Sequence, residues 1–303
     1  MALWLMKRAA WLSGHDDVRE ADAKYIHTSL RKAAGIFLYV KSNADKLSGM
    51  HVFAGNDFEL SILEAYAGQC IAEAQEVAIA RAIELKHSPT LISSLAHDTA
   101  LKYQTCDKYL ERHEMERFEK WRRYFQLKHR FYLAYAYAYL GEQLLAEDKC
   151  GEAIRACREG VTNHQLAKDL CDKYASSRGP GFLAQPEKHL FFRRVVPLIE
   201  RHLENAQREN DFIYHHKVPT DCPPLMNVEE KARFGLAKPE PFTYPPRAEE
   251  WTVVCYDKGF NISHAPMPDF KPAKGGKALT AVKEEKLYET DRDPSTLSGC
   301  TIT

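Results

Sequence analysis

A long alanine-rich segment between Phe58 and Lys86 limits the folds that this chain can adopt. Alanine has the highest helix propensity, and its small side chain lets neighbouring helices approach closely. The segment therefore predicts one long helix that packs among other helices. It contains seven alanines, at positions 65, 67, 72, 74, 78, 80 and 82.

Most of the first 210 residues have the same helical character, and the breaks have identifiable causes. Ser88 and Pro89 end the alanine-rich helix and begin the next one, as N-cap and first helical residue. Asp17, with Glu20 three residues later, predicts a capping box at an earlier helix start. Pro197 should kink or divide the last helix, because proline has no backbone N–H to donate. The expected helices are a first segment ending near residue 14, then 17–44, 58–86, 89–109, 114–148, 151–176 and 187–210.

Helices of these lengths predict stacked antiparallel hairpins, and one pair has the residue spacing of a tetratricopeptide unit. Gly141 on its first helix and Ala153 on its second are small enough for tight packing. We find no clean second copy at a fixed period. The pattern therefore predicts a mostly α domain with one repeat-like unit. Its residues are Tyr137, Leu140, Gly141, Leu144, Ala153 and Cys157.

The chain changes character after Asn210. Residues 211–250 are rich in proline, which a helical stack cannot accommodate. We expect an extended strap of the same domain, attached to the helices by aromatic side chains. Residues 251–299 are rich in charged residues, proline and glycine, and we expect a linker and a disordered tail. The aromatic residues expected to attach the strap are Phe234, Phe242, Tyr244 and Trp251.

The last four residues, 300–303, form a prenylation box. Cys300 is followed by two small or apolar residues and a C-terminal threonine, the pattern that protein prenyltransferases recognise. The small Thr303 favours addition of a farnesyl group over addition of a geranylgeranyl group, and we expect methylation to accompany it. One prenyl chain attaches a protein to a membrane only weakly, and no polybasic patch lies nearby. We therefore expect the folded domain to supply a second contact by binding a membrane-associated protein.

Composition and motifs argue against several classes of function. The 42 basic and 42 acidic residues balance, which argues against a nucleic-acid binder. The eight cysteines contain no Cys-x-x-Cys pair, so we expect neither a metal site nor a disulfide scaffold, and a reducing compartment fits. His113 and Glu114 resemble part of a zinc-protease helix, but Arg117 replaces the second histidine. We expect no catalytic residue, no metal and no cofactor.

Several motifs resemble a known family. Residues 72–77 read Ala-Glu-Ala-Gln-Glu-Val, residues 148–155 read Asp-Lys-Cys-Gly-Glu-Ala-Ile-Arg, and residues 207–214 read Gln-Arg-Glu-Asn-Asp-Phe-Ile-Tyr. They are similar to the BRO domain of the Alix and Brox family, and residues 34–37 and 80–87 resemble its Brox branch. The resemblance covers roughly residues 1–250 and the prenylation box.

This resemblance implies a boomerang-shaped adaptor that is not an enzyme. Its concave face would bind the C-terminal amphipathic helix of an ESCRT-III subunit of the charged multivesicular body protein class. The family's pocket positions fall on Ile79 and Ile92, with Leu95 beside them, although ordinary core residues would look the same. The family domain also begins before Met1 with a small β-sheet, so we expect an N-terminally truncated BRO domain that lacks this sheet.

Such an adaptor would be cytoplasmic and peripheral to membranes where ESCRT-III acts, such as the endosome or the nuclear envelope. Two alternatives remain open. A tetratricopeptide-like chaperone or scaffold would hold an acidic peptide with a clamp of lysine and asparagine side chains on several repeats. A truncated isoform could instead have lost partner binding. The basic stretch from Lys120 to Arg130 would either face an acidic partner helix or form a solvated helix face.

Overall fold

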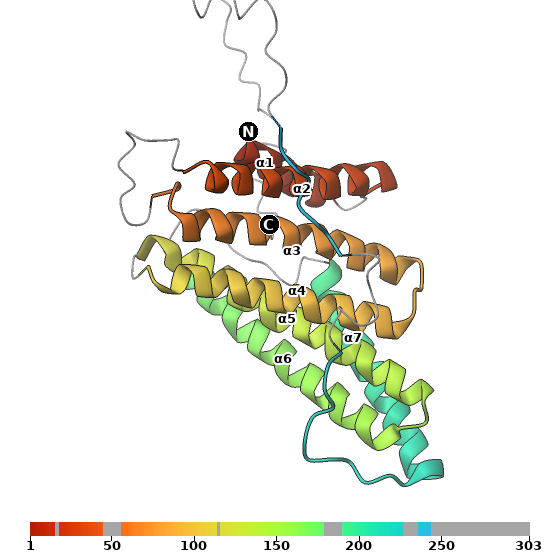
Figure 1. Ribbon diagram of the computed structural model, residues 1–303. Helices are drawn as coiled ribbons and strands as arrows, with labels where there is room; N and C mark the ends of the chain where they lie inside the picture. The colour runs from red at the N-terminus through yellow and green to blue at the C-terminus, as the bar shows by residue number, and fades with distance from the viewer. Residues whose placement is uncertain (16–17, 45–55, 114–115, 179–189, 227–235, 244–303) are drawn as a thin grey trace, which may run out of the picture. The chain divides into compact units, whose positions relative to one another are not determined.

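The computed structural model describes residues 1–15, 18–44, 56–113, 116–178, 190–226 and 236–243. In these ranges the chain forms seven α-helices, one short π-helical turn and no strand (Figure 1). This confirms the expected mostly α fold. None of the described helices is both long and apolar enough to cross a membrane. The helices are α1 (Ala2–Ser13), α2 (Glu20–Ser42), α3 (Leu60–Glu84), α4 (Pro89–Glu111), α5 (Glu116–Ala146), α6 (Cys150–Ser176) and α7 (Leu190–Glu209).

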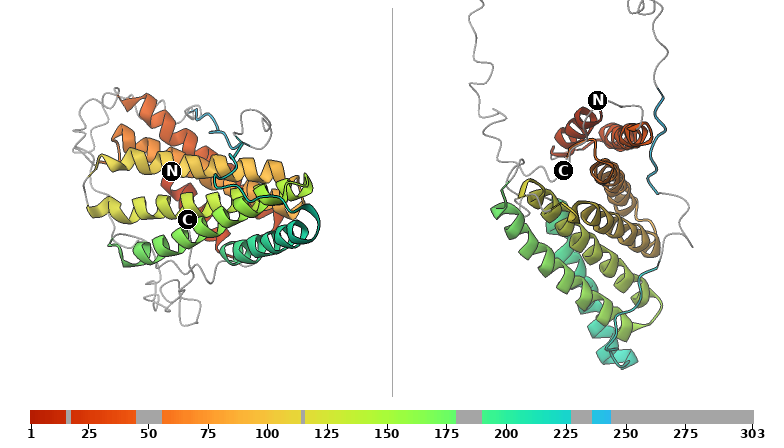
Figure 2. Two further views of the ribbon diagram at one scale, coloured as in Figure 1. Left: turned by 90° about the horizontal axis from the view of Figure 1, so that it is seen from below. Right: turned by 60° about the vertical axis from the view of Figure 1, so that its left-hand side comes forward.

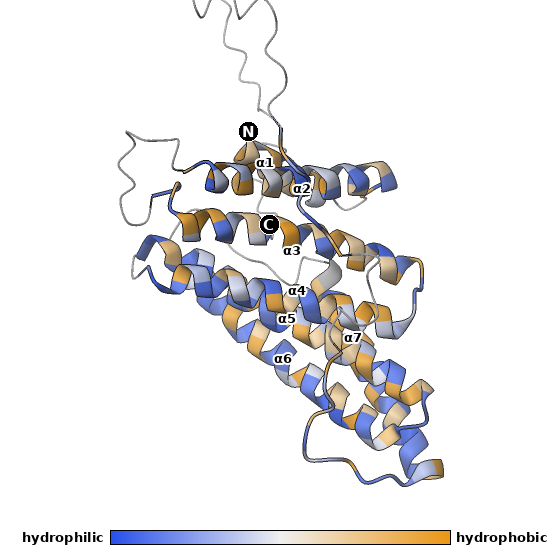
Figure 3. Ribbon diagram, in the orientation of Figure 1, coloured by the Kyte–Doolittle hydropathy of each residue, from blue (hydrophilic) through white to orange (hydrophobic). Residues whose placement is uncertain are grey.

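Each helix packs against the next one along the chain, and α7 also contacts α5. Figure 2 shows α7 alongside α5 and α6. Hydrophobic residues recur along each helix and alternate with hydrophilic ones, which Figure 3 shows as mixed orange and blue ribbons. This periodicity buries one stripe of each helix between its neighbours. The predicted stack of helical hairpins is therefore present.

The starts of two helices test the capping predictions. Ser88 is the N-cap of α4, and its hydroxyl accepts a hydrogen bond from the backbone N–H of Leu91 at 3.4 Å, as predicted. The N-cap of α2 is Arg19, which makes no side-chain cap, so the predicted start at Asp17 is wrong. Asp17 itself lies outside the described residues. Acidic residues in the first turn of α2 stabilise its N-terminal dipole without a capping side chain.

Pro197 lies inside α7, which continues through it as a single helix. The alternative that Pro197 divides this helix is therefore wrong. Four buried residues recur along α7 on both sides of the proline, and their packing outweighs the loss of one backbone hydrogen bond. They are Val195, Ile199, His202 and Ala206.

Helical hydrogen bonding extends past the predicted end of the helical core at residue 210. A π-helical turn, η3 (Asn210–Tyr214), follows α7. It ends at His215, whose φ of 50° is left-handed. The irregular chain thus begins at residue 215 and not at 211. We call its described parts, 215–226 and 236–243, the strap.

The predicted aromatic attachment of the strap is present at one position. Phe242 packs edge-on against Tyr39 of α2, with 5.3 Å between ring centroids. Phe234, Tyr244, Trp251 and the tail fall outside the described residues.

The repeat-like pair consists of α5 and α6. A Cβ atom on Gly141 would lie 2.4 Å from the Sγ atom of Cys157, so the two helices approach closely only because residue 141 is glycine. Leu140, Leu144 and Ala153 form a buried cluster at the same end of the pair. The tight packing predicted from the tetratricopeptide spacing is confirmed.

Candidate partner-binding site

The three predicted pocket positions lie in the hydrophobic core. Ile79 of α3 has no exposed surface, and Ile92 and Leu95 of α4 each expose 2%. All three belong to the core cluster formed mainly by α3, α4 and α5. In this structure none of them offers a surface to a partner. Their contact with a partner helix stays a prediction.

The strap crosses the helices close to these positions. The Gln75 side chain donates to the carbonyl oxygen of Leu95 at 3.2 Å and accepts from the backbone N–H of Ala237 at 3.3 Å. One buried glutamine therefore joins α3, the turn of α4 that carries Leu95, and the strap. Figure 1 shows this part of the strap passing across α2 and α3.

A cavity of about 540 Å³ opens beside the strap, on the face that α2, α3 and α4 share. We call it the strap groove. Leu101 is 39% exposed in its wall. The charged groups along it already have partners, because Lys102 binds Asp98 and Lys41 binds Glu64. The groove therefore presents apolar surface with little free charge. Its apolar lining includes Leu38, Ala67, Gly68, Ile71, Leu101, Tyr109, Ala237 and Pro239.

A second cavity, of about 560 Å³, lies between α3, α5 and α7. We call it the arginine groove, because Arg193, Arg194 and Arg201 of α7 line it. Their side chains are exposed, and none forms an ion pair with another residue in the described part of the chain. The sequence analysis predicted neither groove. The recurrence of arginine on one face of α7 is the sequence signal that indicates the arginine groove. The apolar lining is Ala80, Ile83, Tyr135, Tyr139, Pro197 and Leu198.

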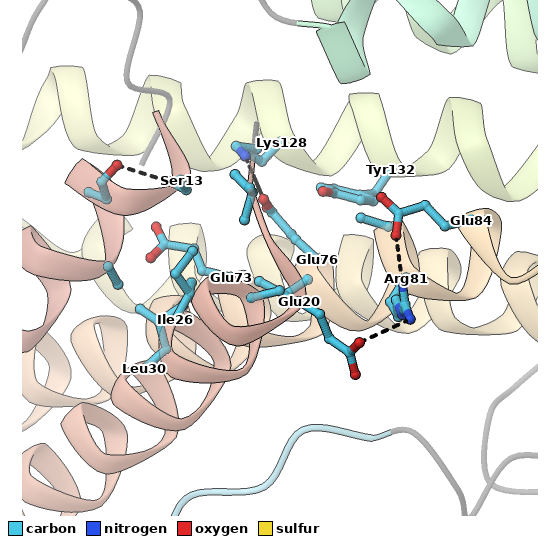
Figure 4. A pocket seen from close by; sticks show the side chains of 16 residues that line it. Ser13, Glu20, Ile26, Leu30, Glu73, Glu76, Arg81, Glu84, Lys128 and Tyr132 are labelled. Carbon is cyan, nitrogen blue, oxygen red and sulfur yellow. Dashed lines mark hydrogen bonds and ion pairs between the residues drawn. The ribbon is translucent and has the colours of Figure 1, made fainter. Parts of the chain in front are cut away.

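A third, smaller cavity of about 240 Å³ lies between α1, α2, α3 and α5 (Figure 4). Inside it, the ammonium group of Lys128 donates to both carboxylate oxygens of Glu76, at 3.0 and 2.8 Å. At its edge, Arg81 pairs with Glu84 at 3.1 Å and with Glu20 at 3.9 Å. Figure 4 shows these pairs as dashed lines between the labelled side chains. The contacts tie α3 to α5 and to the start of α2.

Glu73 extends this polar network into the core. Its carboxylate accepts hydrogen bonds from Gln69 at 2.6 Å and from the Tyr124 hydroxyl at 3.0 Å. Burial, together with the nearby charge of Glu76, raises the pKa of Glu73 to about 7. Trp121 donates to Gln69 at 2.7 Å and completes the link between α3 and α5. Buried polar groups are stable only when hydrogen-bonded. The hydrogen bonds of Gln69, Glu73, Trp121 and Tyr124 meet this need and at the same time hold α3 against α5.

The basic stretch from Lys120 to Arg130 is turned inward. Lys120 and Lys128 are buried. Arg122 pairs with Asp107 of α4 at 2.8 Å, and Arg130 donates to Asn163 of α6 at 3.2 Å. This stretch therefore connects helices and is not the solvated helix face considered from the sequence, while its contact with an acidic partner helix stays a prediction.

The described residues contain no group of three or more His, Cys, Asp or Glu that could hold a metal ion. Burial raises the pKa of several thiols, that of Cys157 to about 12, which leaves them protonated and unreactive. Cys300, the predicted lipidation site, lies outside the described residues.

Comparison with known proteins identifies the family. The BRO1-like domain matches residues 6–260 of this chain. The chain belongs to the BRO1-like domain family. The predicted resemblance to the Brox branch is confirmed by a curated relative from Caenorhabditis elegans, "BRO1 domain-containing protein BROX homolog", 52% identical over the whole chain. The human "BRO1 domain-containing protein BROX" is 47% identical over 89% of the chain. The chain spans 70% and 64% of the lengths of these two relatives.

Solved structures of the BRO1-like family show the same fold. One titled "ALIX BRO1 CHMP4C complex" superimposes with a TM-score of 0.63 at 21% identity and covers 80% of this chain and 61% of that one. Another, on endosomal targeting by the Bro1 domain, superimposes with a TM-score of 0.59 at 21% identity, covering 79% of this chain and 61% of that one.

The motifs by which the sequence resembles the BRO domain hold the strap in place. Asn210 exchanges two hydrogen bonds with the backbone of His216, at 2.8 and 3.0 Å. Tyr214 donates to Asp148 at 2.5 Å. A Cβ atom on Gly151 would lie 2.6 Å from the carbonyl oxygen of Lys217. The motif residues at 148–155 and 207–214 therefore meet in space and set the path of the strap as it leaves α7.

Proposed function

We propose that this chain is an adaptor without catalytic activity that binds the C-terminal amphipathic helix of an ESCRT-III subunit. The observation that carries this proposal is membership of the BRO1-like family, together with a fold shared with an ALIX domain whose structure is titled as a complex with CHMP4C. The partner would belong to the charged multivesicular body protein class. No nucleic acid, metal or cofactor takes part in the proposed function.

The strap groove is the surface that we propose for this helix. An amphipathic helix binds by laying its apolar stripe into an apolar groove. The groove lies on the face that carries the strap, and Gln75 joins the strap to the turn of α4 that carries Leu95. The buried positions Ile79, Ile92 and Leu95 do not line the groove. We propose that these three support the packing behind it, and that Leu101 contacts the partner directly. The paired charges along the groove favour a partner whose contacting stripe is apolar.

Membrane attachment is the second part of the proposal. A prenyl group on Cys300 would bring the adaptor to a membrane, and the ESCRT-III helix would supply the second contact that one prenyl chain needs. The adaptor would then be a cytoplasmic, peripheral membrane protein, at the endosome or the nuclear envelope. Labelling of the expressed chain with a farnesyl analogue, compared with Cys300→Ser, tests this part separately. Absence of label on the wild-type chain would contradict membrane attachment through Cys300.

Binding of fluorescent C-terminal helices from each ESCRT-III subunit tests the adaptor function. We expect micromolar affinity for at least one helix, and a loss of at least tenfold in Leu101→Asp. Leu166→Asp is a matched control, because Leu166 on α6 is also 39% exposed but lies outside the groove. Equal binding by the two variants would exclude the strap groove. No binding to a folded wild-type chain would contradict the adaptor function, and capture of acidic peptide tails instead would favour the tetratricopeptide-like alternative.

A further inference from the structure

The arginine groove has a different chemistry from the strap groove. Arg194, Pro197, Leu198 and Arg201 stand at positions i, i+3, i+4 and i+7 of α7, so they form one stripe along the helix. This stripe is separate from the buried face of α7. It presents a pair of apolar side chains with an arginine at each end.

The opposite wall and the floor of the groove are mostly apolar. Ile83 of α3 forms part of the wall, and the rings of Tyr135 and Tyr139 on α5 lie at the floor, largely buried. Glu84, also on the α3 side, is engaged by Arg81 at 3.1 Å. Charge is therefore distributed unevenly, with uncompensated positive charge along the α7 side alone.

The arginines have no carboxylate partner among the described residues. Arg201 acts on Glu142 without an ion pair: the pKa of Glu142 is raised by burial and lowered to a smaller extent by Arg201. Pro197 also leaves the carbonyl group of Arg193 without the usual helical N–H donor, because proline carries none. Exposed arginines beside apolar and aromatic surface are the composition of binding hot spots.

We propose that the arginine groove is a second docking site, and that it binds an acidic amphipathic helix of a partner protein. Charge complementarity is the argument for this occupant. Arg194 and Arg201 are separated by two helical turns, about 10.5 Å along α7. A partner helix lying along α7 would pair with both through carboxylates seven residues apart, and large apolar residues midway between them would contact the partly buried Leu198 and Ile83.

A helix fits this site better than an anionic membrane does. The apolar lining lies between α3 and α7, so a flat bilayer would touch the exposed arginines without filling the groove between these helices. The two grooves share only α3, of which they use different turns, and the other elements that line them differ: α2, α4 and the strap for one, α5 and α7 for the other. The chain would therefore hold two helical segments at once, and this inference does not depend on occupation of the strap groove.

The probe is a fluorescent designed helix with two glutamates seven positions apart and a pair of leucines midway between them. We expect the 303-residue chain to bind it, and the double variant Arg194→Glu with Arg201→Glu to lose at least tenfold in affinity. The same peptide with lysines in place of the glutamates should not bind. Arg158→Glu, an exposed change on α6 outside the groove, should bind the probe as the wild type does.

An unlabelled ESCRT-III helix should leave the bound probe in place, and Leu101→Asp should bind the probe normally. These controls separate a failure of this inference from a failure of the adaptor function. Equal binding of the glutamate and lysine peptides, or unchanged binding by the double variant, would overturn the inference. So would binding of phosphatidylserine vesicles through Arg194 and Arg201 without binding of the peptide, because that result would identify a membrane contact.

Discussion

The carbonyl oxygen of Glu240 occupies the space that a side chain would need on Gly35. A Cβ atom built on Gly35 would lie 1.8 Å from that oxygen. Two hydrogen bonds beside it join the same pieces of chain, from Glu240 N–H to the Arg31 carbonyl at 3.0 Å and from Arg31 Nε to the Lys238 carbonyl at 2.7 Å. The strap thus lies directly on the backbone of α2, and residue 35 must be glycine for it to do so.

Gly35→Ala should detach the strap at residues 236–243 while the helices remain folded. The clash involves backbone atoms that cannot rotate away, and we expect a loss of roughly 1 to 3 kcal/mol in unfolding free energy. Hydrogen exchange should increase at the Ala237 and Glu240 amides. Gly160→Ala is the control, because a Cβ atom there meets its nearest neighbour at 3.4 Å. That variant should be neutral or slightly more stable. Unchanged exchange in Gly35→Ala would show that the strap is not held here.

Glu73→Gln should stabilise the chain at alkaline pH. The pKa of Glu73 is raised from 4.5 to about 7, so the folded chain holds this proton more tightly than the unfolded chain does. The protonated Glu73 therefore stabilises the folded chain fully below about pH 4.5, and this stabilisation is lost as the pH rises through 7. The glutamine side chain keeps an oxygen that can accept the hydrogen bonds from Gln69 and Tyr124.

The advantage of Glu73→Gln should be on the order of 2 kcal/mol at pH 8 and small at pH 5. Urea unfolding followed by circular dichroism at both pH values measures it. Glu152→Gln, an exposed change on α6, is the control for the effect of the substitution itself on stability. A Glu73→Gln variant that is less stable than the wild type at pH 8 would mean that the ionised carboxylate is needed by Lys128.

Ile79→Asp should unfold the domain instead of blocking a partner selectively. The side chain has no exposed surface, and an unpaired buried carboxylate costs roughly 3 kcal/mol or more. Ile79→Val should cost only about 1 kcal/mol. Thermal unfolding of both variants beside Leu101→Asp provides the comparison, since the exposed Leu101 change should alter stability by less than about 0.5 kcal/mol. A well-folded Ile79→Asp variant would show that this side chain can reach solvent.

Gly141→Ala should destabilise the α5–α6 pair, and Cys157→Ala should relieve part of the effect. The new methyl group would overlap the Cys157 sulfur, at a cost of roughly 1 to 3 kcal/mol. Removing that sulfur makes room. A double-mutant cycle in urea should therefore give a favourable coupling of about 1 kcal/mol. Additive effects of the two changes would mean that the backbone, and not the Cys157 side chain, limits the approach of these helices.

Local signals in the sequence predicted much of this fold. Ser88 followed by Pro89 marked the start of α4 correctly, because capping depends on a few neighbouring residues. The small residues Gly141 and Ala153 marked the close helix pair. The alternative that Pro197 divides the last helix was wrong, because the buried face on both sides of the proline keeps α7 continuous, and such packing is not visible in a local pattern.

The sequence by itself determined the helical class, the proline-rich segment after α7 and the family, because these follow from composition, periodicity and motifs. The tertiary structure decided which apolar residues are accessible. Ile79 and Leu101 are both apolar residues on long helices, yet one is buried and the other lines the strap groove. The arginine groove likewise exists only where α3, α5 and α7 meet. Exposure depends on neighbours that are distant in the sequence, so a surface that binds partners is a property of the packed helices.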